Sequence, residues 1–113
     1  MIIFLRALFA LVLAGMFFVT ITATLERGVF DAATDLWDDP WFRATLADAY
    51  FGFLTVYVWI AYRERGWPRR VLWFLLLMAL GNIAIAGYLL WALFRLPPDA
   101  PLERLLLRPG ERV

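Results

Sequence analysis

The side chain with the clearest potential for chemistry is a lone carboxylate inside an apolar segment. Asp48 lies eight residues after Pro40, and no other acidic residue occurs between Asp39 and Glu64. If this segment is a helix, Asp48 lies about 12 Å from its start. Ionisable groups at such a depth in a membrane usually face a bundle interior or a cavity. Asp48 could therefore hold a proton, a cation or a cationic partner, or it could serve only as a hydrogen-bonding contact between helices.

Small and polar residues accompany Asp48 at helical spacing, and a later apolar segment has a matching set. Within each set the members recur at intervals of three and four residues, the spacing of a stripe that packs against a neighbouring helix. The two sets form a predicted polar stripe, made of Thr45, Asp48, Gly52, Thr55, Ala79, Asn82 and Ala86. Asp48 and Asn82 would lie at similar depth on adjacent antiparallel helices, so we predict a hydrogen bond between them. Such bonds hold transmembrane helices together. The sequence leaves open whether Asp48 also holds a proton, a cation or a cationic partner.

Several residue types needed for common enzyme chemistry are absent from the sequence. It contains no Lys, His, Cys, Ser or Gln, and all eleven basic residues are Arg. Without His and Cys, most zinc, copper, haem and iron–sulfur sites are excluded, and without Ser and His so are the usual hydrolase triads. A Schiff base within the chain would need Lys. The sequence therefore predicts a protein that is not an enzyme and that has neither a metal nor an organic cofactor.

The composition indicates a membrane protein. Of the 113 residues, 64% are hydrophobic, more than is usual for a soluble domain, and the formal net charge of +1 does not indicate nucleic-acid binding. Apolar runs predict three transmembrane helices at about residues 7–24, 40–62 and 70–94, the first of them just long enough to cross a hydrocarbon core of about 30 Å. We expect an all-α fold in which these helices form one antiparallel bundle. A cleaved signal peptide is the alternative for the first run, but Arg6 follows an apolar start instead of a basic segment.

Cap and turn residues mark the limits of the predicted helices. Asp39 followed by Pro40 is typical of an N-cap and a first helical residue. Gly66 suits the position after a helix end, and Pro68 suits the start of the next helix. The tail, residues 97–113, predicts either a short amphipathic helix on the membrane surface or an unstructured segment.

The first predicted loop is acidic and is flanked by tryptophan. Asp31, Asp35 and Asp39 would share one face if this loop were helical, which would suggest a divalent-cation site; otherwise they are simply solvated. Five tryptophans fall near predicted helix ends and are interpreted as an interfacial aromatic belt. They are Trp37, Trp41, Trp67, Trp73 and Trp91.

Arginines set the predicted orientation. Arg63, Arg65, Arg69 and Arg70 flank the connection between the second and third predicted helices. By the positive-inside rule, this connection and the N-terminus are cytoplasmic. A third span would then place the tail outside, together with arginines of its own, against the same rule. The uniform use of Arg is typical of a GC-rich bacterial genome, so we expect the bacterial inner membrane.

Three motifs resemble a family of small membrane proteins of unknown function found in bacteria and plants. They are Asp39-Pro40-Trp41, Asp48-Ala49-Tyr50-Phe51-Gly52-Phe53 and Leu80-Gly81-Asn82-Ile83-Ala84. The resemblance covers about residues 25–105. It implies three spans and draws attention to Asp48 and Asn82, but it implies no substrate.

The expected role is that of an accessory or scaffolding subunit that acts through helix–helix packing, as a homo-oligomer or within a larger membrane complex. A three-helix bundle of this size has little room for a complete solute pathway. One alternative is a component of an oligomeric channel or transporter, with Asp48 lining the pathway. Another is a lipid- or pigment-binding membrane protein that uses its aromatic residues.

Overall fold

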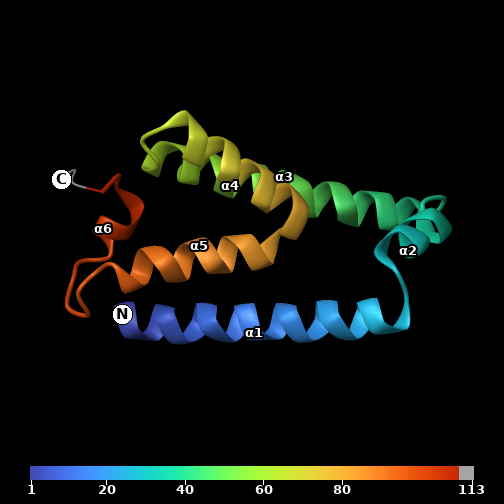
Figure 1. Ribbon diagram of the computed structural model, residues 1–113, viewed down its shortest axis with the longest axis horizontal. Coiled ribbons are helices and arrows are strands. Elements are labelled where there is room, and N and C mark those ends of the chain that lie inside the picture. Colours follow the sequence, from blue (N-terminus) through green and yellow to red (C-terminus); the bar gives the residue numbers. More distant parts are fainter. Residues whose placement is uncertain (110–113) are drawn as a thin grey trace.

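The computed structural model describes residues 1–109, and within that range every regular element is a helix. Two long helices, α1 and α3, are joined by the short helix α2; a hairpin of α4 and α5 follows, and then the single turn α6 (Figure 1). The bounds are Ile2–Glu26 for α1, Val29–Leu36 for α2, Pro40–Arg63 for α3, Trp67–Leu80 for α4, Asn82–Phe94 for α5 and Glu103–Leu106 for α6. The all-α prediction is confirmed for this part of the chain.

Helices α1 and α3 are long and apolar enough to cross a membrane. They have 25 and 24 residues and are therefore about 37 and 36 Å long, against about 30 Å for a hydrocarbon core. α1 starts at Ile2 and includes Arg6, which was expected to precede it. The start of α3 is as predicted. Pro40 is its first residue, and the Asp39 carboxylate accepts a 2.9 Å hydrogen bond from the Trp41 amide.

The predicted third span, residues 70–94, is wrong as a continuous helix. It is divided into α4 and α5, which meet at Gly81 and run in opposite directions (Figure 1). α4 has 14 residues and α5 has 13, so each is about 20 Å long, too short to cross a hydrocarbon core by itself. Two long helices and a helical hairpin therefore take the place of the expected three-helix bundle.

The reversal depends on the backbone of Gly81. Its φ of 57° and ψ of −122° lie outside the regions that residues with a side chain adopt readily. A Cβ atom at this position would lie 2.6 Å from Cζ of Phe53 in α3. The Tyr50 hydroxyl of α3 donates a 2.9 Å hydrogen bond to the Met78 carbonyl, which lies in the last turn of α4, where carbonyls have no partner inside the helix. Gly81 and α3 together support the turn.

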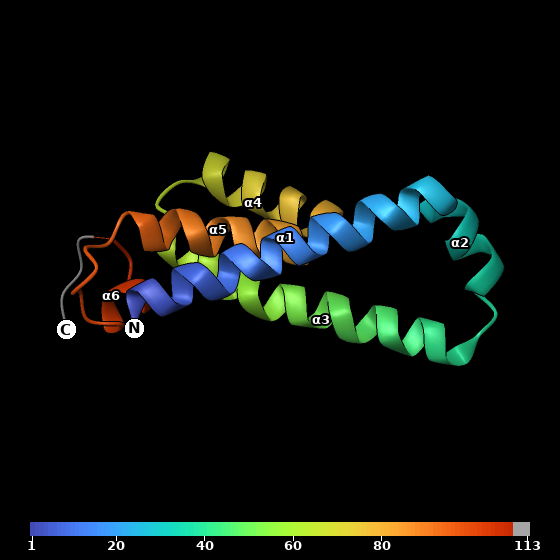
Figure 2. The ribbon, with the colours of Figure 1, turned by 90° about the horizontal axis from the view of Figure 1, so that it is seen from below.

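Helix α5 lies at the centre of the molecule, between α1 on one side and α3 and α4 on the other (Figures 1 and 2). Its alanines let neighbouring helices approach closely, and Ala86, part of the predicted polar stripe, is 1% exposed. One buried cluster joins α1, α5 and α6 and consists of Ile2, Ala92, Leu93 and Leu105. A second joins α3, α4 and α5 and consists of Ile60, Leu77, Ala84 and Tyr88.

The connection between α3 and α4 differs from the prediction at Gly66. α3 ends at Arg63, and the residue that caps it is Glu64, whose amide donates a 2.9 Å hydrogen bond to the Ile60 carbonyl. Gly66 instead precedes α4 as its N-cap residue, in extended backbone. Pro68 lies in the first turn of α4, as predicted.

The tail lies beside the α3–α4 connection and not at the opposite end of the molecule (Figure 2). The indole N–H of Trp59 donates to the Leu106 carbonyl, and the Arg63 guanidinium donates to the Leu107 carbonyl, each over 3.2 Å. Of the predicted amphipathic tail helix only one turn, α6, is present in the described residues, and its Leu105 is buried. Because the chain reverses at Gly81, the tail returns to the end from which α1 starts. Residues 110–113 of the predicted tail lie outside the described range.

The two ends of the molecule have opposite charge. At the basic end are the start of α1, the α3–α4 connection, the end of α5 and α6; at the acidic end is α2 (Figure 2). Within residues 1–109, the basic end has three carboxylates, Glu64, Asp99 and Glu103, and eight arginines, namely Arg6, Arg63, Arg65, Arg69, Arg70, Arg95, Arg104 and Arg108. The acidic end has two arginines, Arg27 and Arg43, and five carboxylates, namely Glu26, Asp31, Asp35, Asp38 and Asp39.

Candidate functional site

The predicted polar stripe does not join α3 to α5 within one chain. Asp48 and Asn82 are both exposed, and within residues 1–109 their side chains make no hydrogen bond to each other. α3 instead packs on the hairpin through a different face, which includes Phe53, Tyr57 and Ile60. The expected Asp48–Asn82 pair is therefore absent, because the hairpin contacts a neighbouring stripe of α3.

The other members of the stripe are also exposed, apart from Ala86. Thr45, Gly52, Thr55 and Ala79 lie on the surface of the described chain. The Thr55 hydroxyl donates a 2.9 Å hydrogen bond to the Phe51 carbonyl of its own helix, so it needs no neighbour. None of the four takes part in the two buried clusters.

The α3 part of the stripe lies on the same face of α3 as Trp59. Trp59 follows Thr55 at helical spacing and packs on the buried cluster of α1, α5 and α6. Residues three or four positions apart share a helix face, so Asp48 and Gly52 face the same side further along α3. There the hairpin no longer covers them, because its Gly81 turn lies against Phe53.

Helix α1 is uncovered over the same half of the molecule. Its residues towards α5 are partly buried as far as Met16, and Thr20 and Ala23 continue that stripe at helical spacing. Every residue in the range 17–31 of the chain is exposed, as is every residue in the range 43–52 of α3. We call these two stretches the open half. They comprise the end of α1 with the residues that follow it, and part of the first half of α3, which contacts the hairpin through the hydrogen bond from Tyr50 to Met78.

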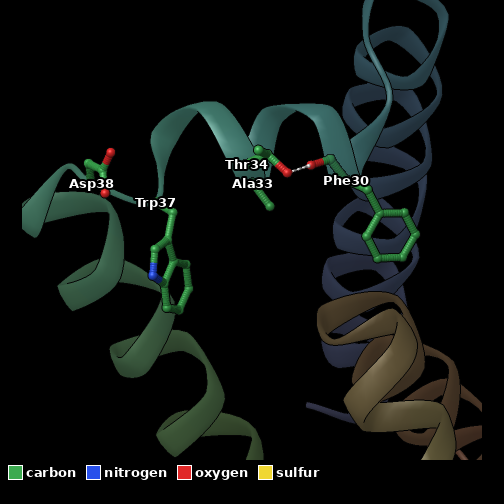
Figure 3. A pocket seen from close by; sticks show the side chains of 5 residues that line it. All are labelled: Phe30, Ala33, Thr34, Trp37 and Asp38. Carbon is green, nitrogen blue, oxygen red and sulfur yellow. Dashed lines mark hydrogen bonds between the residues drawn. The ribbon is translucent and has the colours of Figure 1, made fainter.

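Helix α2 crosses the end of the open half. Phe30 of α2 and Trp37, the residue after α2, project towards the space between α1 and α3, whereas Asp38 points away from it (Figure 3). A hollow of about 410 Å³ is lined by Phe30, Ala33, Thr34, Trp37 and Asp38. The Thr34 hydroxyl donates to the Phe30 carbonyl over 2.9 Å, so the wall that faces the open half is mainly apolar.

A second candidate site is a buried polar cluster near the basic end. Arg63, Glu64 and Tyr88 are 6%, 5% and 1% exposed. The Tyr88 hydroxyl donates a 3.0 Å hydrogen bond to Oε1 of Glu64 and accepts one of 3.4 Å from Arg63. Arg69 lies 3.6 Å from Oε2 of Glu64. The cluster thus holds a buried carboxylate between Tyr88 of α5 and Arg69 of α4, and Arg63 of α3 donates to the Tyr88 hydroxyl.

This cluster was not identified from the sequence. The segment Arg63-Glu64-Arg65 indicates only a helix end, and Tyr88 lies 24 positions after Glu64, too far for any helical spacing to connect them. The available signal was a tyrosine in the middle of an apolar helix, since a buried hydroxyl needs a partner. Trp73, expected in the interfacial belt, belongs to this region instead. It is partly buried, and its ring centroid lies 4.8 Å from that of Tyr88.

The other belt tryptophans lie near the two ends of the molecule. Trp37 and Trp41 are exposed at the acidic end, and Trp67 and Trp91 are exposed towards the basic end. Their positions fit an interfacial role, which stays a prediction. Within residues 1–109, no group of three acidic side chains is placed to hold a metal ion.

Arginines at the basic end satisfy carbonyl groups at two helix ends. Arg6 donates to the carbonyls of Leu93 and Leu96 over 2.7–3.3 Å. Arg70 donates to the carbonyls of Ala61 and Glu64 over 3.0 and 3.1 Å. The last carbonyls of a helix lack partners inside it, so these side chains cap α5 and α3. Arg70 therefore stabilises a helix end in addition to contributing positive charge to the α3–α4 connection.

Comparison with known proteins identifies the chain's relatives. Residues 1–112 match the family described as Protein of unknown function (DUF1475). The chain belongs to this family. The match extends beyond the motifs on which the expected resemblance was based, and the family's description assigns no activity. No curated protein and no solved structure gave a match.

Proposed function

We propose that this protein is an integral membrane protein with two spans, α1 and α3, and a re-entrant hairpin formed by α4 and α5. The lengths of the helices support this arrangement, because α1 and α3 exceed the hydrocarbon thickness whereas α4 and α5 reach only about two-thirds of it. The Gly81 turn then lies inside the membrane. Non-helical backbone is tolerated at that depth where protein buries it, and Gly81 is buried against α3.

The charge distribution supports a cytoplasmic basic end. With a re-entrant hairpin, the start of α1, the α3–α4 connection and the tail all face the same compartment. Arg95, Arg104 and Arg108 then lie on the same side as Arg63 and Arg65, which the positive-inside rule favours. The acidic end, with α2, faces the opposite compartment. The conflict that a third span would create is removed.

Within the membrane, the protein acts as an accessory or scaffolding subunit that receives a transmembrane helix of a neighbouring chain in its open half. The observation that carries this proposal is the open half itself, whose residues are all exposed and whose hydrogen bond to the hairpin is the one from Tyr50 to the Met78 carbonyl. Thr20 and Ala23 of α1 and Gly52 of α3 lie on the uncovered stripes, and small residues allow close helix approach in lipid.

Asp48 adds a reason for a protein neighbour. Its carboxylate is exposed on the described chain, about 12 Å from the start of α3, and an ionisable group facing lipid at such a depth is costly. A neighbouring helix that offers a hydrogen-bond donor or a cation at this level would lower the cost. Asp48 therefore serves as a specificity contact between chains, in place of the expected contact within one chain.

Photo-crosslinking in intact cells tests the proposal. A photoreactive residue at Gly52 should give a protein–protein crosslink, because Gly52 is on the stripe facing the open half. The same residue at Leu54, at nearly the same depth on the opposite side of α3, is the matched control and should not. A product of twice the chain mass indicates a second copy, and a heavier product a different subunit. Equal crosslinking from both positions would contradict a defined interface in the open half.

A second candidate function, lipid binding, is favoured by the hollow beneath α2. Its lining by Phe30, Ala33 and Trp37 is apolar (Figure 3), and Phe30 belongs to the open half. A bound acyl chain would then fill the open half. Crosslinks from Gly52 to lipid alone, without protein, would favour this function over the scaffolding role.

A further inference from the structure

The arginine side chains at the basic end fall into two groups that differ in their hydrogen bonds. Arg6, Arg63, Arg65, Arg70 and Arg108 all donate hydrogen bonds to backbone carbonyls of the chain. Three others, Arg69, Arg95 and Arg104, are exposed, and among residues 1–109 their side chains make no hydrogen bond. The first group is required by the fold, whereas the second keeps its donors available.

The available arginines occur on three different elements. Arg69 is in the first turn of α4, Arg95 follows the end of α5, and Arg104 is in α6. Arg69 keeps a long contact of 3.6 Å with Glu64, and Arg95 lies over the Trp91 ring at 4.8 Å. Neither interaction uses the full set of guanidinium donors. The arginines thus surround the basic end and are not confined to one helix.

We propose that these three arginines bind the phosphate groups of anionic phospholipids in the leaflet that the basic end faces. The inference rests on the proposed membrane insertion and adds a partner to it. A guanidinium group donates to phosphate through two parallel N–H groups, and basic residues next to a membrane are attracted by anionic lipids. Trp67 and Trp91, both exposed at this end, place it at the level of the headgroups, because tryptophan favours that layer.

The charge of the surroundings selects lipid phosphate over a cationic or neutral headgroup. In the described part of the chain, the basic end has eight arginines against three carboxylates, and one of these carboxylates, Glu64, is 5% exposed and already bonded to Tyr88. The acidic end has the reverse excess, so a phosphate would be repelled there. The two ends therefore predict a preference for anionic lipid that is confined to one leaflet.

The test uses the full chain in vesicles of phosphatidylcholine and phosphatidylglycerol at a molar ratio of 3:1. The chain is extracted in mild detergent, and the lipid that stays bound is counted by native mass spectrometry. The wild type should retain phosphatidylglycerol in excess of its share in the vesicle. In the triple variant R69Q/R95Q/R104Q, the enrichment of phosphatidylglycerol should be about tenfold lower than in the wild type. R43Q, at the acidic end, is the matched control and should keep it.

Two readouts separate failure of this inference from failure of the proposed membrane insertion. Resistance of each variant to alkaline extraction from the vesicles reports insertion, and it should be the same for the wild type and the triple variant. The lipid-binding inference alone would be overturned if the wild type inserts but shows no phosphatidylglycerol enrichment. It would also be overturned if the triple variant keeps the wild-type enrichment. Wild-type protein that alkali removes from the vesicles would overturn insertion, and the inference with it.

Discussion

The basic and acidic ends of this molecule are built from the same two long helices but are stabilised very differently. At the basic end, α1 and α3 are joined through α5 and α6, and arginine side chains satisfy the carbonyls at the helix ends. At the acidic end, residues 17–31 and 43–52 are exposed throughout, and α2 makes the only helical connection there in the described chain. The difference arises at Gly81, where the chain turns back and leaves half of the bundle without a third helix.

This contrast suggests a division of roles between the ends. The basic end has buried side chains from four parts of the chain, so substitutions there should change the stability of the isolated protein. The open half contributes few internal contacts, so substitutions there should change association with a neighbour and leave the isolated protein intact. Four substitutions test this division, in order of decreasing expected effect on stability.

The largest effect is expected for Gly81→Ala. The substitution forces a side chain into φ 57° and ψ −122° and brings a Cβ atom within 2.6 Å of the Phe53 ring, so the hairpin should be destabilised by roughly 3 kcal/mol. Thermal unfolding in detergent measures this. Gly87→Ala is the matched control, because a Cβ at Gly87 has no atom within 4 Å and alanine favours the helix. Similar unfolding temperatures for the two variants would mean that the chain does not reverse at Gly81.

The next largest effect is expected for Arg6→Gln. It removes the charged hydrogen bonds to the Leu93 and Leu96 carbonyls and should cost about 2 kcal/mol. Arg43→Gln, at the acidic end, should change stability by less than about 0.5 kcal/mol. Chemical denaturation of both variants in the same detergent measures the difference. Equal losses would contradict the separation of structural and surface arginines between the two ends.

A smaller effect is expected for Tyr88→Phe. The buried Glu64 carboxylate would lose its 3.0 Å hydrogen bond from the hydroxyl, at a cost of about 1–2 kcal/mol. Glu64→Gln keeps an acceptor oxygen for Tyr88 at nearly the same volume and should therefore be milder. The order of their unfolding temperatures checks this, and a more severe Glu64→Gln would show that Arg69 and Arg63 depend on the carboxylate more than Tyr88 does.

The smallest effect on the isolated chain is expected for Asp48→Leu. Because Asp48 is exposed, its replacement should change stability by less than about 0.5 kcal/mol, while the protein–protein crosslink from Gly52 is lost. Asp48→Asn should keep that crosslink, because an amide still offers hydrogen bonds. A large loss of stability in Asp48→Leu would show that the carboxylate has a partner within the chain.

Local signals in the sequence were sufficient for the parts of the fold that local chemistry determines. The Asp39–Pro40 start of α3 depends on one side chain and the next three residues, and it is confirmed. The two long apolar helices follow from runs of hydrophobic residues. The reversal at Gly81 was missed because a single glycine is tolerated inside a helix, and whether the chain turns there depends on Phe53 and Tyr50, nearly thirty residues away.

The packing face of α3 was predicted wrongly, for a different reason. In an almost wholly apolar helix, many stripes at intervals of three and four residues are equally compatible with packing. The small and polar residues around Asp48 defined one stripe, whereas Phe53, Tyr57 and Ile60 of another contact the hairpin. For the cluster of Arg63, Glu64 and Tyr88, the sequence indicates only that the Tyr88 hydroxyl needs a partner, because its members meet through the tertiary fold.

The re-entrant hairpin places the tail and the α3–α4 connection on the same side of the membrane, and accessibility to a thiol reagent measures this sidedness. The chain has no cysteine, so single cysteines at Trp67, Leu102 and Thr34 can be labelled with an impermeant thiol reagent in sealed membranes of both orientations. With a re-entrant hairpin, we expect positions 67 and 102 to be labelled from the same side, the cytoplasm, and position 34 from the other. Labelling of positions 67 and 102 from opposite sides would mean that residues 70–94 cross the membrane, and the re-entrant hairpin would be contradicted.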